Sequence, residues 1–150
     1  MTGLYSKQNQ MSARRSGTYD KVMASLKECP FCDLKKKYII KRVSGMYLTV
    51  NLFPYTDGHL LIISQRHLEN IGQLTKKEWV AIFRLILLAQ KLLKKHLKIK
   101  DFALVYHQGH RSGRSLKHFH LSIIPKAKGV LKKEYQQVNI APIDLARMLK

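Results

Sequence analysis

The sequence predicts an α+β fold, in which an antiparallel sheet of about five strands packs against one long helix and short helices. Short runs of β-branched and aromatic residues stand on either side of turn-forming residues, which is typical of β-hairpins. Residues 75–97 instead repeat apolar residues at a helical period. Because the expected strands outnumber the helices and come in hairpins, we expect an antiparallel sheet with helices on one face.

The strands are expected as two hairpins and a strand between them. Ser44 and Gly45 form the turn of the first hairpin, and the glycine-bearing loop 109–113 joins the strands of the second. After Pro125 the chain matches no motif, and we expect a strand near Val138 and a short helix at the end. The five expected strands cover residues 38–43, 46–50, 58–63, 102–106 and 116–124.

The long helix has a clear start signal. Thr75 and Glu78 fit a capping box, in which the hydroxyl and the carboxylate satisfy free amides of the first turn. Lysines near residue 95 suit the negative end of the helix dipole. The residues expected to form its buried stripe are Trp79, Ile82, Phe83, Ile86, Leu87 and Leu93.

Composition points to a single basic domain. The chain has 150 residues, of which 45% are hydrophobic, and 28 Lys and Arg against 9 Asp and Glu give a net charge of +19. Such a charge favours polyanionic partners such as phosphates, nucleotides, nucleic acid or an anionic membrane surface. A membrane span is excluded, because the longest apolar stretch, residues 79–89, contains Arg84 and is shorter than the roughly 20 residues that a span needs.

The chain divides into an arm and a domain. Residues 1–25 are basic and lack a clear amphipathic stripe, so we expect a flexible N-terminal arm, with an organellar presequence as the alternative. Residues 26–150 form the domain. Cys29 and Cys32 lie in C-x₂-C spacing with no secretory segment before them, which favours a reducing, cytoplasmic location.

The segment around the last expected strand carries the chemistry. Alternate side chains of a strand share a face, so His118, His120 and Ser122 point one way while the apolar residues between them face the core. Two adjacent imidazoles can bind a metal, transfer protons or act as nucleophiles, and a solvent-facing pair is the alternative. The preceding loop offers parts of a phosphate cradle, namely Arg111, Ser112, Gly113, Arg114 and Ser115.

Five motifs follow one another in order over about residues 29–125. They are Cys-Pro-Phe-Cys at 29–32, Asn-Leu-Phe-Pro-Tyr at 51–55, Gly-His-Leu-Leu-Ile-Ile at 58–63, Arg-His at 66–67 and Gly-Arg-Ser-Leu-Lys-His-Phe-His at 113–120. Together they resemble the histidine triad (HIT) family of nucleotide hydrolases and transferases. The family pattern is His-φ-His-φ-His-φ-φ, where φ is apolar, and this chain departs from it with Ser122 in the third histidine position and Arg114 where many members have Gln.

The resemblance implies a HIT-like fold and covalent catalysis at phosphorus. In the family the middle histidine attacks the α-phosphate of a nucleotide, for example in a dinucleoside polyphosphate or a nucleotidyl conjugate, and forms a nucleotidyl-histidine. His120 is then the nucleophile, with His118 and Ser122 as the flanking catalytic residues. An imidazole whose Nδ1–H is held by a backbone carbonyl presents a free Nε2 lone pair for this step. The expected substrate-binding residues are Asn51, Gly113, Arg114 and Ser115, with Asn51 on the ribose unless it only caps a turn.

Ser122 leaves the type of reaction open. A hydroxyl can donate one hydrogen bond, but it cannot carry a positive charge or store a proton near neutral pH. Reduced turnover, a leaving group that needs no protonation and nucleotidyl transfer are all compatible with it.

The resemblance also implies a structural zinc ion. A C-x₂-C pair supplies half of a tetrahedral site. Zinc-bearing members of the family take the other two ligands from the positions of His67 and His118. Two thiolates and two neutral imidazoles suit Zn²⁺, whereas the alternative is a pair of reduced thiols without metal.

Relatives are commonly homodimers, and we expect the same here. Two other functions stay open beside the nucleotide enzyme. One is a non-catalytic module that binds nucleotides or, through its basic surface, nucleic acid. The other is a metal-dependent hydrolase with His118 and His120 as ligands of a catalytic metal. His59 is expected to be a hydrogen-bonded structural residue.

Overall fold

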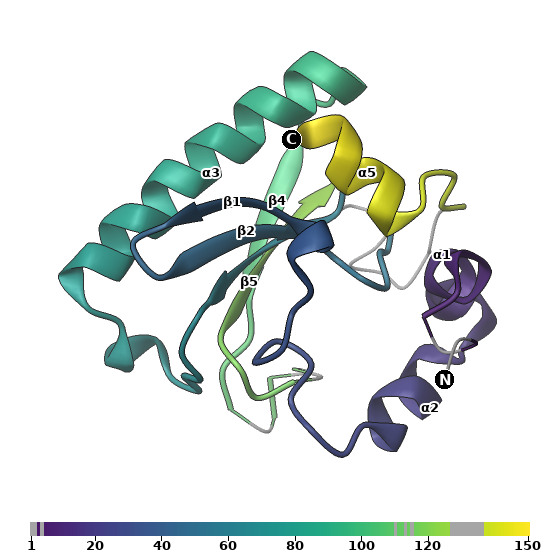
Figure 1. The fold of residues 1–150 in the computed structure, drawn as a ribbon, viewed down its shortest axis with the longest axis horizontal. Coiled ribbons are helices and arrows are strands. Elements are labelled where there is room, and N and C mark those ends of the chain that lie inside the picture. The colour runs from purple at the N-terminus through teal and green to yellow at the C-terminus, as the bar shows by residue number, and fades with distance from the viewer. Residues whose placement is uncertain (1–2, 4, 110, 113, 115, 127–136) are drawn as a thin grey trace.

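A computed structural model describes residues 3, 5–109, 111–112, 114, 116–126 and 137–150 (Figure 1). The described chain contains one five-stranded sheet in the order β1-β2-β3-β5-β4, and all neighbouring strands are antiparallel. This confirms the expected fold class. The strands are β1 (Ile39–Val43), β2 (Met46–Val50), β3 (Leu60–Ser64), β4 (Phe102–Tyr106) and β5 (His120–Pro125).

The first hairpin forms as predicted, whereas the last strand is shorter than predicted. Ser44 and Gly45, with φ of 45° and 79°, join β1 to β2, and two positive φ values in a row match the twist of a two-residue hairpin turn. The β5 strand begins at His120 instead of residue 116. Just before it, the Phe119 amide donates to the Leu68 carbonyl at 2.6 Å, so this part of the chain pairs with a loop and not with a strand.

Two helices cover one face of the sheet, as Figure 1 shows. The long helix α3 (Lys76–Leu97) contacts β2 and β3, and the C-terminal helix α5 (Pro142–Leu149) contacts β1 and β2. The main core lies between these helices and the sheet. The remaining helices are α1 (Lys7–Ser16), α2 (Tyr19–Ser25) and the 3₁₀ turns η1 (Lys36–Tyr38) and η2 (Ile71–Gln73).

The start of α3 is as predicted, but its buried face is partly different. The Glu78 amide donates to the Thr75 hydroxyl at 3.1 Å, and the Thr75 amide donates to the Glu78 carboxylate at 2.8 Å, which completes the capping box. Ile82 and Leu93 are buried and Ile86 is half-buried, as expected. The residues that the sequence wrongly placed in the core are Trp79, Phe83 and Leu87, which are 47%, 62% and 49% exposed.

The reason is that α3 carries apolar residues on more than one side. The sheet takes the side that also bears Ala81 and Ala89, both buried, because small side chains let the helix approach the strands closely. Leu85 completes that side. The larger apolar side chains of Trp79, Phe83 and Leu87 therefore remain exposed.

In the N-terminal segment, for which the sequence predicts a flexible arm over residues 1–25, the structure places α1 and α2, which pack on the domain. Ala13, Tyr19 and Val22 are buried in a cluster with Phe53, and the Lys7 ammonium lies 3.0 Å from the Asp144 carboxylate. Helices this short are marginal alone, so their stability comes from packing that a local sequence pattern does not reveal.

The C-terminal prediction is confirmed in part. The expected short helix is α5. Residues 137–139, with Val138 buried, form no strand, and residues 127–136 lie outside the described part of the chain. Among the described helices, none has both the length and the apolar character needed to cross a membrane.

Candidate active site and metal centre

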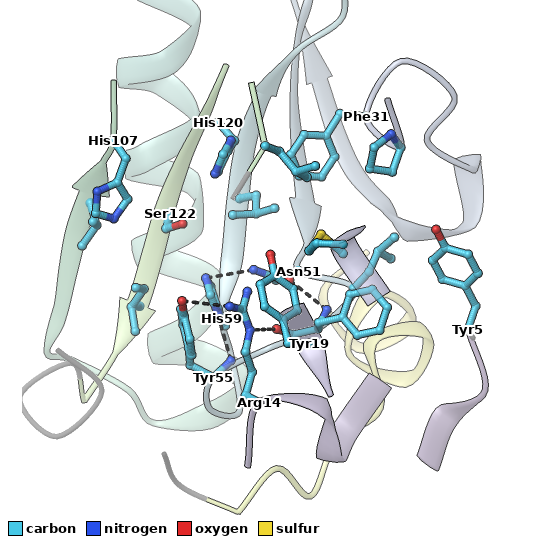
Figure 2. A pocket seen from close by; sticks show the side chains of 18 residues that line it. Tyr5, Arg14, Tyr19, Phe31, Asn51, Tyr55, His59, His107, His120 and Ser122 are labelled. Atoms are coloured by element: carbon cyan, nitrogen blue, oxygen red, sulfur yellow. Dashed lines mark hydrogen bonds between the residues drawn. The ribbon is translucent and has the colours of Figure 1, made fainter. Parts of the chain in front are cut away.

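The β5 strand separates two kinds of side chain, as the sequence predicted. Phe119, Leu121 and Ile123 belong to the main core under α3 and α5. His120 and Ser122 point to the opposite face of the sheet, where both line a cavity (Figure 2). His118 is fully buried, and its ring lies in a separate group of side chains with Cys29.

His120 is held in one orientation by the backbone. Its Nδ1 lies 2.8 Å from the carbonyl oxygen of His118, and since a carbonyl only accepts, Nδ1 carries the proton. The Nε2 atom therefore has a free lone pair. Burial lowers the pKa of His120, and the positive charges of Arg14 and Arg114 lower it as well, against the opposing effect of the backbone hydrogen bond. The imidazole is thus neutral near pH 7.

The cavity beside His120 is small and covered. Its volume is about 70 Å³, whereas sites for small organic ligands usually span roughly 300–1,000 Å³. Tyr5, Arg14 and Tyr19 of the N-terminal segment form part of its wall (Figure 2). A second cavity of about 560 Å³ shares Tyr5, Pro30 and Leu52 with it. Of the described residues of the N-terminal segment, Tyr5 borders both spaces.

Asn51 and His59 form a hydrogen-bonded unit in the cavity wall. The Asn51 Oδ1 accepts from the Phe53 amide at 2.8 Å, which is the turn-capping role considered above, and its Nδ2 lies 3.2 Å from the His59 Nε2. The Tyr55 amide donates to the His59 Nδ1 at 3.1 Å. Burial holds the pKa of His59 well below its ordinary value, and the charge of Arg14 adds to this. His59 is thus the hydrogen-bonded residue expected.

The predicted phosphate loop is only partly visible. Gly113 and Ser115 lie outside the described residues. Arg114 is half-buried, and its Nη1 donates to the carbonyl of Glu69 at 3.4 Å, so a backbone oxygen holds its guanidinium. His107 lines the cavity, whereas His96 is exposed on α3.

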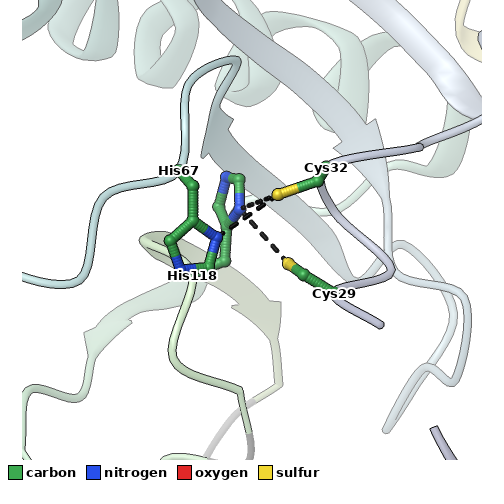
Figure 3. Close-up of side chains that lie close together, drawn as sticks. All are labelled: Cys29, Cys32, His67 and His118. Atoms are coloured by element: carbon green, nitrogen blue, oxygen red, sulfur yellow. Dashed lines mark hydrogen bonds between the residues drawn. The ribbon is translucent and has the colours of Figure 1, made fainter. Parts of the chain in front are cut away.

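The side chains of Cys29, Cys32, His67 and His118 lie close together (Figure 3). The His118 Nδ1 lies 3.4 Å from the Cys29 Sγ and 3.5 Å from the Cys32 Sγ, and the His67 Nδ1 lies 3.3 Å from the Cys32 Sγ. All four donor atoms are within 4.8 Å of one another. Tetrahedral zinc with ordinary Zn–S and Zn–N bond lengths would place sulfur and nitrogen about 3.6 Å apart. The group could therefore hold a metal.

The hydrogen bond at the other ring nitrogen of His118 leaves Nδ1 in the state that a metal ligand needs. The His118 Nε2 lies 2.6 Å from the carbonyl oxygen of Ser64, so Nε2 carries the proton, and the lone pair of Nδ1, on the side of the cysteines, is free for a metal. His118 and His120 thus point to different groups, which argues against a catalytic metal shared by these two histidines.

Sequence reasoning missed Arg14. This residue comes from α1, and its Nε and Nη1 donate to the Phe53 carbonyl and the Tyr55 hydroxyl, both at 2.9 Å. The guanidinium carbon lies 3.2 Å from the centre of the Tyr19 ring and 4.0 Å from that of Tyr55. No local motif marks Arg14, because its hydrogen-bond partners, Phe53 and Tyr55, lie about 40 residues away in the sequence.

Comparison with known proteins gives one consistent family. The model of the HIT domain matches residues 35–129, which is more than half of the chain. An uncharacterized HIT-like protein of Mycoplasma genitalium is 31% identical over 102 residues, covering 65% of this chain and 72% of that protein. The nitrilase and fragile histidine triad fusion protein NitFhit of Caenorhabditis elegans is 30% identical over 83 residues, 55% of this chain and 19% of that protein.

Two further proteins complete the comparison. Bis(5'-adenosyl)-triphosphatase of Saccharomyces cerevisiae is 32% identical over 83 residues, 55% of this chain and 40% of the yeast protein. The crystal structure of a Zn-bound histidine triad family protein from Mycobacterium smegmatis has the same fold, with a TM-score of 0.65, 17% identity and coverage of 85% of this chain and 91% of that one. Our chain therefore spans less than half of the yeast relative and nearly all of the solved structure.

Proposed function

Because the chain belongs to the HIT domain family, we propose that it is a nucleotide hydrolase or nucleotidyltransferase that works through a covalent nucleotidyl-histidine at His120. The observation that carries this proposal is the 2.8 Å contact between the His120 Nδ1 and the His118 carbonyl. It leaves a neutral imidazole with its Nε2 lone pair free, on the face of β5 that lines the cavity.

Two displacements at phosphorus make up the reaction. In the first, the His120 Nε2 attacks the α-phosphorus, an N–P bond forms, and the bond from phosphorus to the leaving oxygen breaks with its electron pair going to that oxygen. No base is needed, because Nε2 carries no proton, and the Nδ1–H bond to the His118 carbonyl stabilises the charge that develops on the ring. In the second, water or another hydroxyl acceptor attacks phosphorus and forms a P–O bond, its proton passes to solvent, and the electrons of the N–P bond return to Nε2.

Ser122 favours a substrate whose leaving group is itself a phosphate. A phosphate or nucleotide leaves as a stable anion near pH 7, so a neutral hydroxyl in the third position is sufficient. An alkoxide or amine leaving group would need a proton that Ser122 cannot supply. A dinucleoside polyphosphate therefore fits the site best, and the relative named bis(5'-adenosyl)-triphosphatase supports this class.

A whole nucleotide needs more room than the cavity of about 70 Å³ provides. The adjoining cavity of about 560 Å³ could hold a nucleoside, and Tyr5 stands between the two. We infer that the segment carrying Tyr5 shifts when the substrate enters.

Zinc is the metal that the group of Cys29, Cys32, His67 and His118 fits best, because two sulfur and two nitrogen donors at tetrahedral spacing are its usual structural ligands. Such an ion would supply a fixed link between the segment at 29–32 and the residue before β5. His118 then holds its backbone carbonyl steady for His120.

Two further features support the proposed assembly and location. Trp79, Phe83 and Leu87 on α3, and Leu104 on the edge strand β4, are exposed apolar side chains that support a homodimer. Cys29 and Cys32 form no disulfide, which is the state that a reducing cytoplasm would maintain.

The test is to trap the intermediate. Wild-type protein is incubated with diadenosine triphosphate labelled at the α-phosphates, quenched in alkali, in which N–P bonds survive, and mapped by mass spectrometry. We expect the label on His120, none on His120→Ala, and normal labelling of His96→Ala, which changes an exposed histidine of α3. Binding of nucleotide with neither label nor turnover would favour the non-catalytic module instead.

A further inference from the structure

The cavity beside His120 contains one permanently charged side chain among the described residues that line it, and this is Arg14. It comes from α1, which lies outside the stretch of residues 35–129 that matches the family model. A charged group at this place therefore belongs to this chain's own N-terminal segment and not to the common domain.

The guanidinium of Arg14 is fixed in place, yet it keeps donors for a ligand. The rings of Tyr19 and Tyr55 lie close to it, at 3.2 and 4.0 Å from their centres, and two of its nitrogens bind the Phe53 carbonyl and the Tyr55 hydroxyl. A guanidinium has five N–H donors, and those two bonds use Nε and Nη1. Within the described structure, the two N–H groups of Nη2 stay available.

The chemistry proposed for His120 needs positive charge at this place. Negative charge spreads over the phosphate oxygens during each displacement, and cationic donors fixed beforehand stabilise it. Ser122 contributes none, and Arg114, which donates to the Glu69 carbonyl, does not line the cavity. We propose that Arg14 binds the oxygens of the substrate phosphate that His120 attacks, and so supplies the charge missing from the third triad position; this rests on the function proposed above.

Geometry supports this role. Arg14 reaches toward the Asn51–His59 unit in the wall of the cavity (Figure 2), and Arg14 and His120 both line this cavity. A planar cation held against aromatic rings loses little further freedom when it binds a phosphate, and an arginine can make two parallel bonds to it. The cavity of about 70 Å³ is also of the size of a phosphate group and not of a nucleoside.

The test separates phosphate binding from other effects of Arg14. AMP and adenosine differ only by the phosphate, so we measure the binding of both by calorimetry to the wild type, Arg14→Gln and Arg14→Lys. The control is Arg15→Gln, which removes the neighbouring, exposed arginine of the same helix. We expect Arg14→Gln to weaken the binding of AMP about 10- to 100-fold, because a charged bidentate contact is lost. The affinity for adenosine should not change. Arg14→Lys should recover part of this loss, and Arg15→Gln should match the wild type.

A kinetic measurement gives a second readout. In an otherwise unchanged protein, Arg14→Gln should lower kcat/KM for diadenosine triphosphate by a factor similar to its loss of AMP affinity. In a Ser122→His background, where an imidazole is restored, the same change should cost less than about threefold.

Three results would overturn the proposal. Equal AMP affinity of Arg14→Gln and the wild type would show that Arg14 does not touch the phosphate, and tighter AMP binding would show that it blocks the site. Equal weakening of AMP and adenosine would mean that Arg14 only maintains the fold. In all three the function proposed for His120 survives, whereas a wild type that binds no AMP would overturn both.

Discussion

The carbonyl oxygen of His118 lies 2.8 Å from the Nδ1 of His120, so one residue connects the metal-binding group to the proposed nucleophile. The His118 ring is itself fixed on both sides, by the Ser64 carbonyl at Nε2 and by the sulfur of Cys29 near Nδ1. Disturbing the cysteines should therefore change the orientation of His120 although they do not line its cavity.

Replacing Cys29 by Ser tests this link. The variant should lose most of its bound zinc, because a metal site that lacks one thiolate loses most of its affinity. It should also melt at a lower temperature and label more slowly at His120. Metal content by mass spectrometry of the purified protein, thermal melting and the labelling rate are the three measurements.

Asp33→Asn is the matched control for that variant. Asp33 follows Cys32 directly and forms an exposed ion pair with Lys35, which contributes little to stability. Metal content and melting should both stay at the wild-type level. A Cys29→Ser protein that keeps its full zinc content would contradict the assignment of this site.

Restoring a histidine at position 122 should change the range of substrates. Ser122 lies opposite Val105 of β4 and Leu61 of β3 and points into the cavity, so a larger polar side chain there faces the same space. With Ser122→His, hydrolysis of an adenosine phosphoramidate, whose amine must be protonated to leave, should rise about 100-fold. Hydrolysis of diadenosine triphosphate should change far less. Steady-state kinetics on both substrates measure this.

The comparison variant is Ser122→Ala, which removes the hydroxyl and adds no proton donor. It should be no better than the wild type on the phosphoramidate. A similar gain for both variants would mean that cavity size, and not proton donation, limits the reaction.

Local features of the fold could be predicted from the sequence. The alternation of Phe119 to Ile123 and the capping box of Thr75 and Glu78 depend on neighbours within a few residues, and both are confirmed. The grouping of Cys29 with His118 was expected only because the motifs resemble a family, since spacing alone does not bring residues so far apart together.

Features that depend on long-range packing could not be predicted. Trp79 and Ala81 both lie on apolar sides of α3, and only the approach to the sheet decides which is buried. The same holds for Ala13 and Tyr19, whose burial depends on Phe53 far along the chain. Arg14 escaped notice for this reason, since a basic residue near a chain end usually faces solvent.

From the exposed apolar side of α3 we predict a homodimer interface, and a charged residue introduced there should dissociate the dimer. Phe83 is 62% exposed and lies one turn from both Trp79 and Leu87, so Phe83→Glu would place an unpaired carboxylate in the middle of a contact between two copies. We expect the dissociation constant to rise at least about 100-fold. Sedimentation velocity at several concentrations measures it.

Lys77→Glu is the control for that experiment, because it introduces the same carboxylate at an exposed position on a different side of α3. It should leave the dimer intact. A wild type that sediments as a monomer at every concentration, or equal effects of the two variants, would contradict this interface.

The ion pair between Arg66 and Glu78 at the start of α3 should make the stability of the fold depend on pH in the acidic range. The Arg66 Nε lies 2.8 Å from the carboxylate of Glu78, which is nearly buried, and these hydrogen bonds lower the pKa of Glu78 against the opposing effect of burial. A carboxyl group with a lowered pKa in the folded state stabilises the fold above its unfolded pKa, and this contribution is lost as the pH falls through the folded pKa.

Glu78→Gln removes the charge while an amide can still serve in the capping box with Thr75. We expect it to be less stable than the wild type at pH 7, and the difference to shrink once the pH falls below about 4.5, because protonated Glu78 then resembles glutamine. Urea unfolding of both proteins at several pH values between about 3 and 7 covers the range in which a carboxyl group titrates, and it measures the difference in their free energies of unfolding. Thr75→Ala serves as comparison, since loss of an N-cap hydroxyl should cost about 1 kcal/mol. A difference between Glu78→Gln and the wild type that stays constant across this range would mean that the carboxylate charge does not stabilise the helix start.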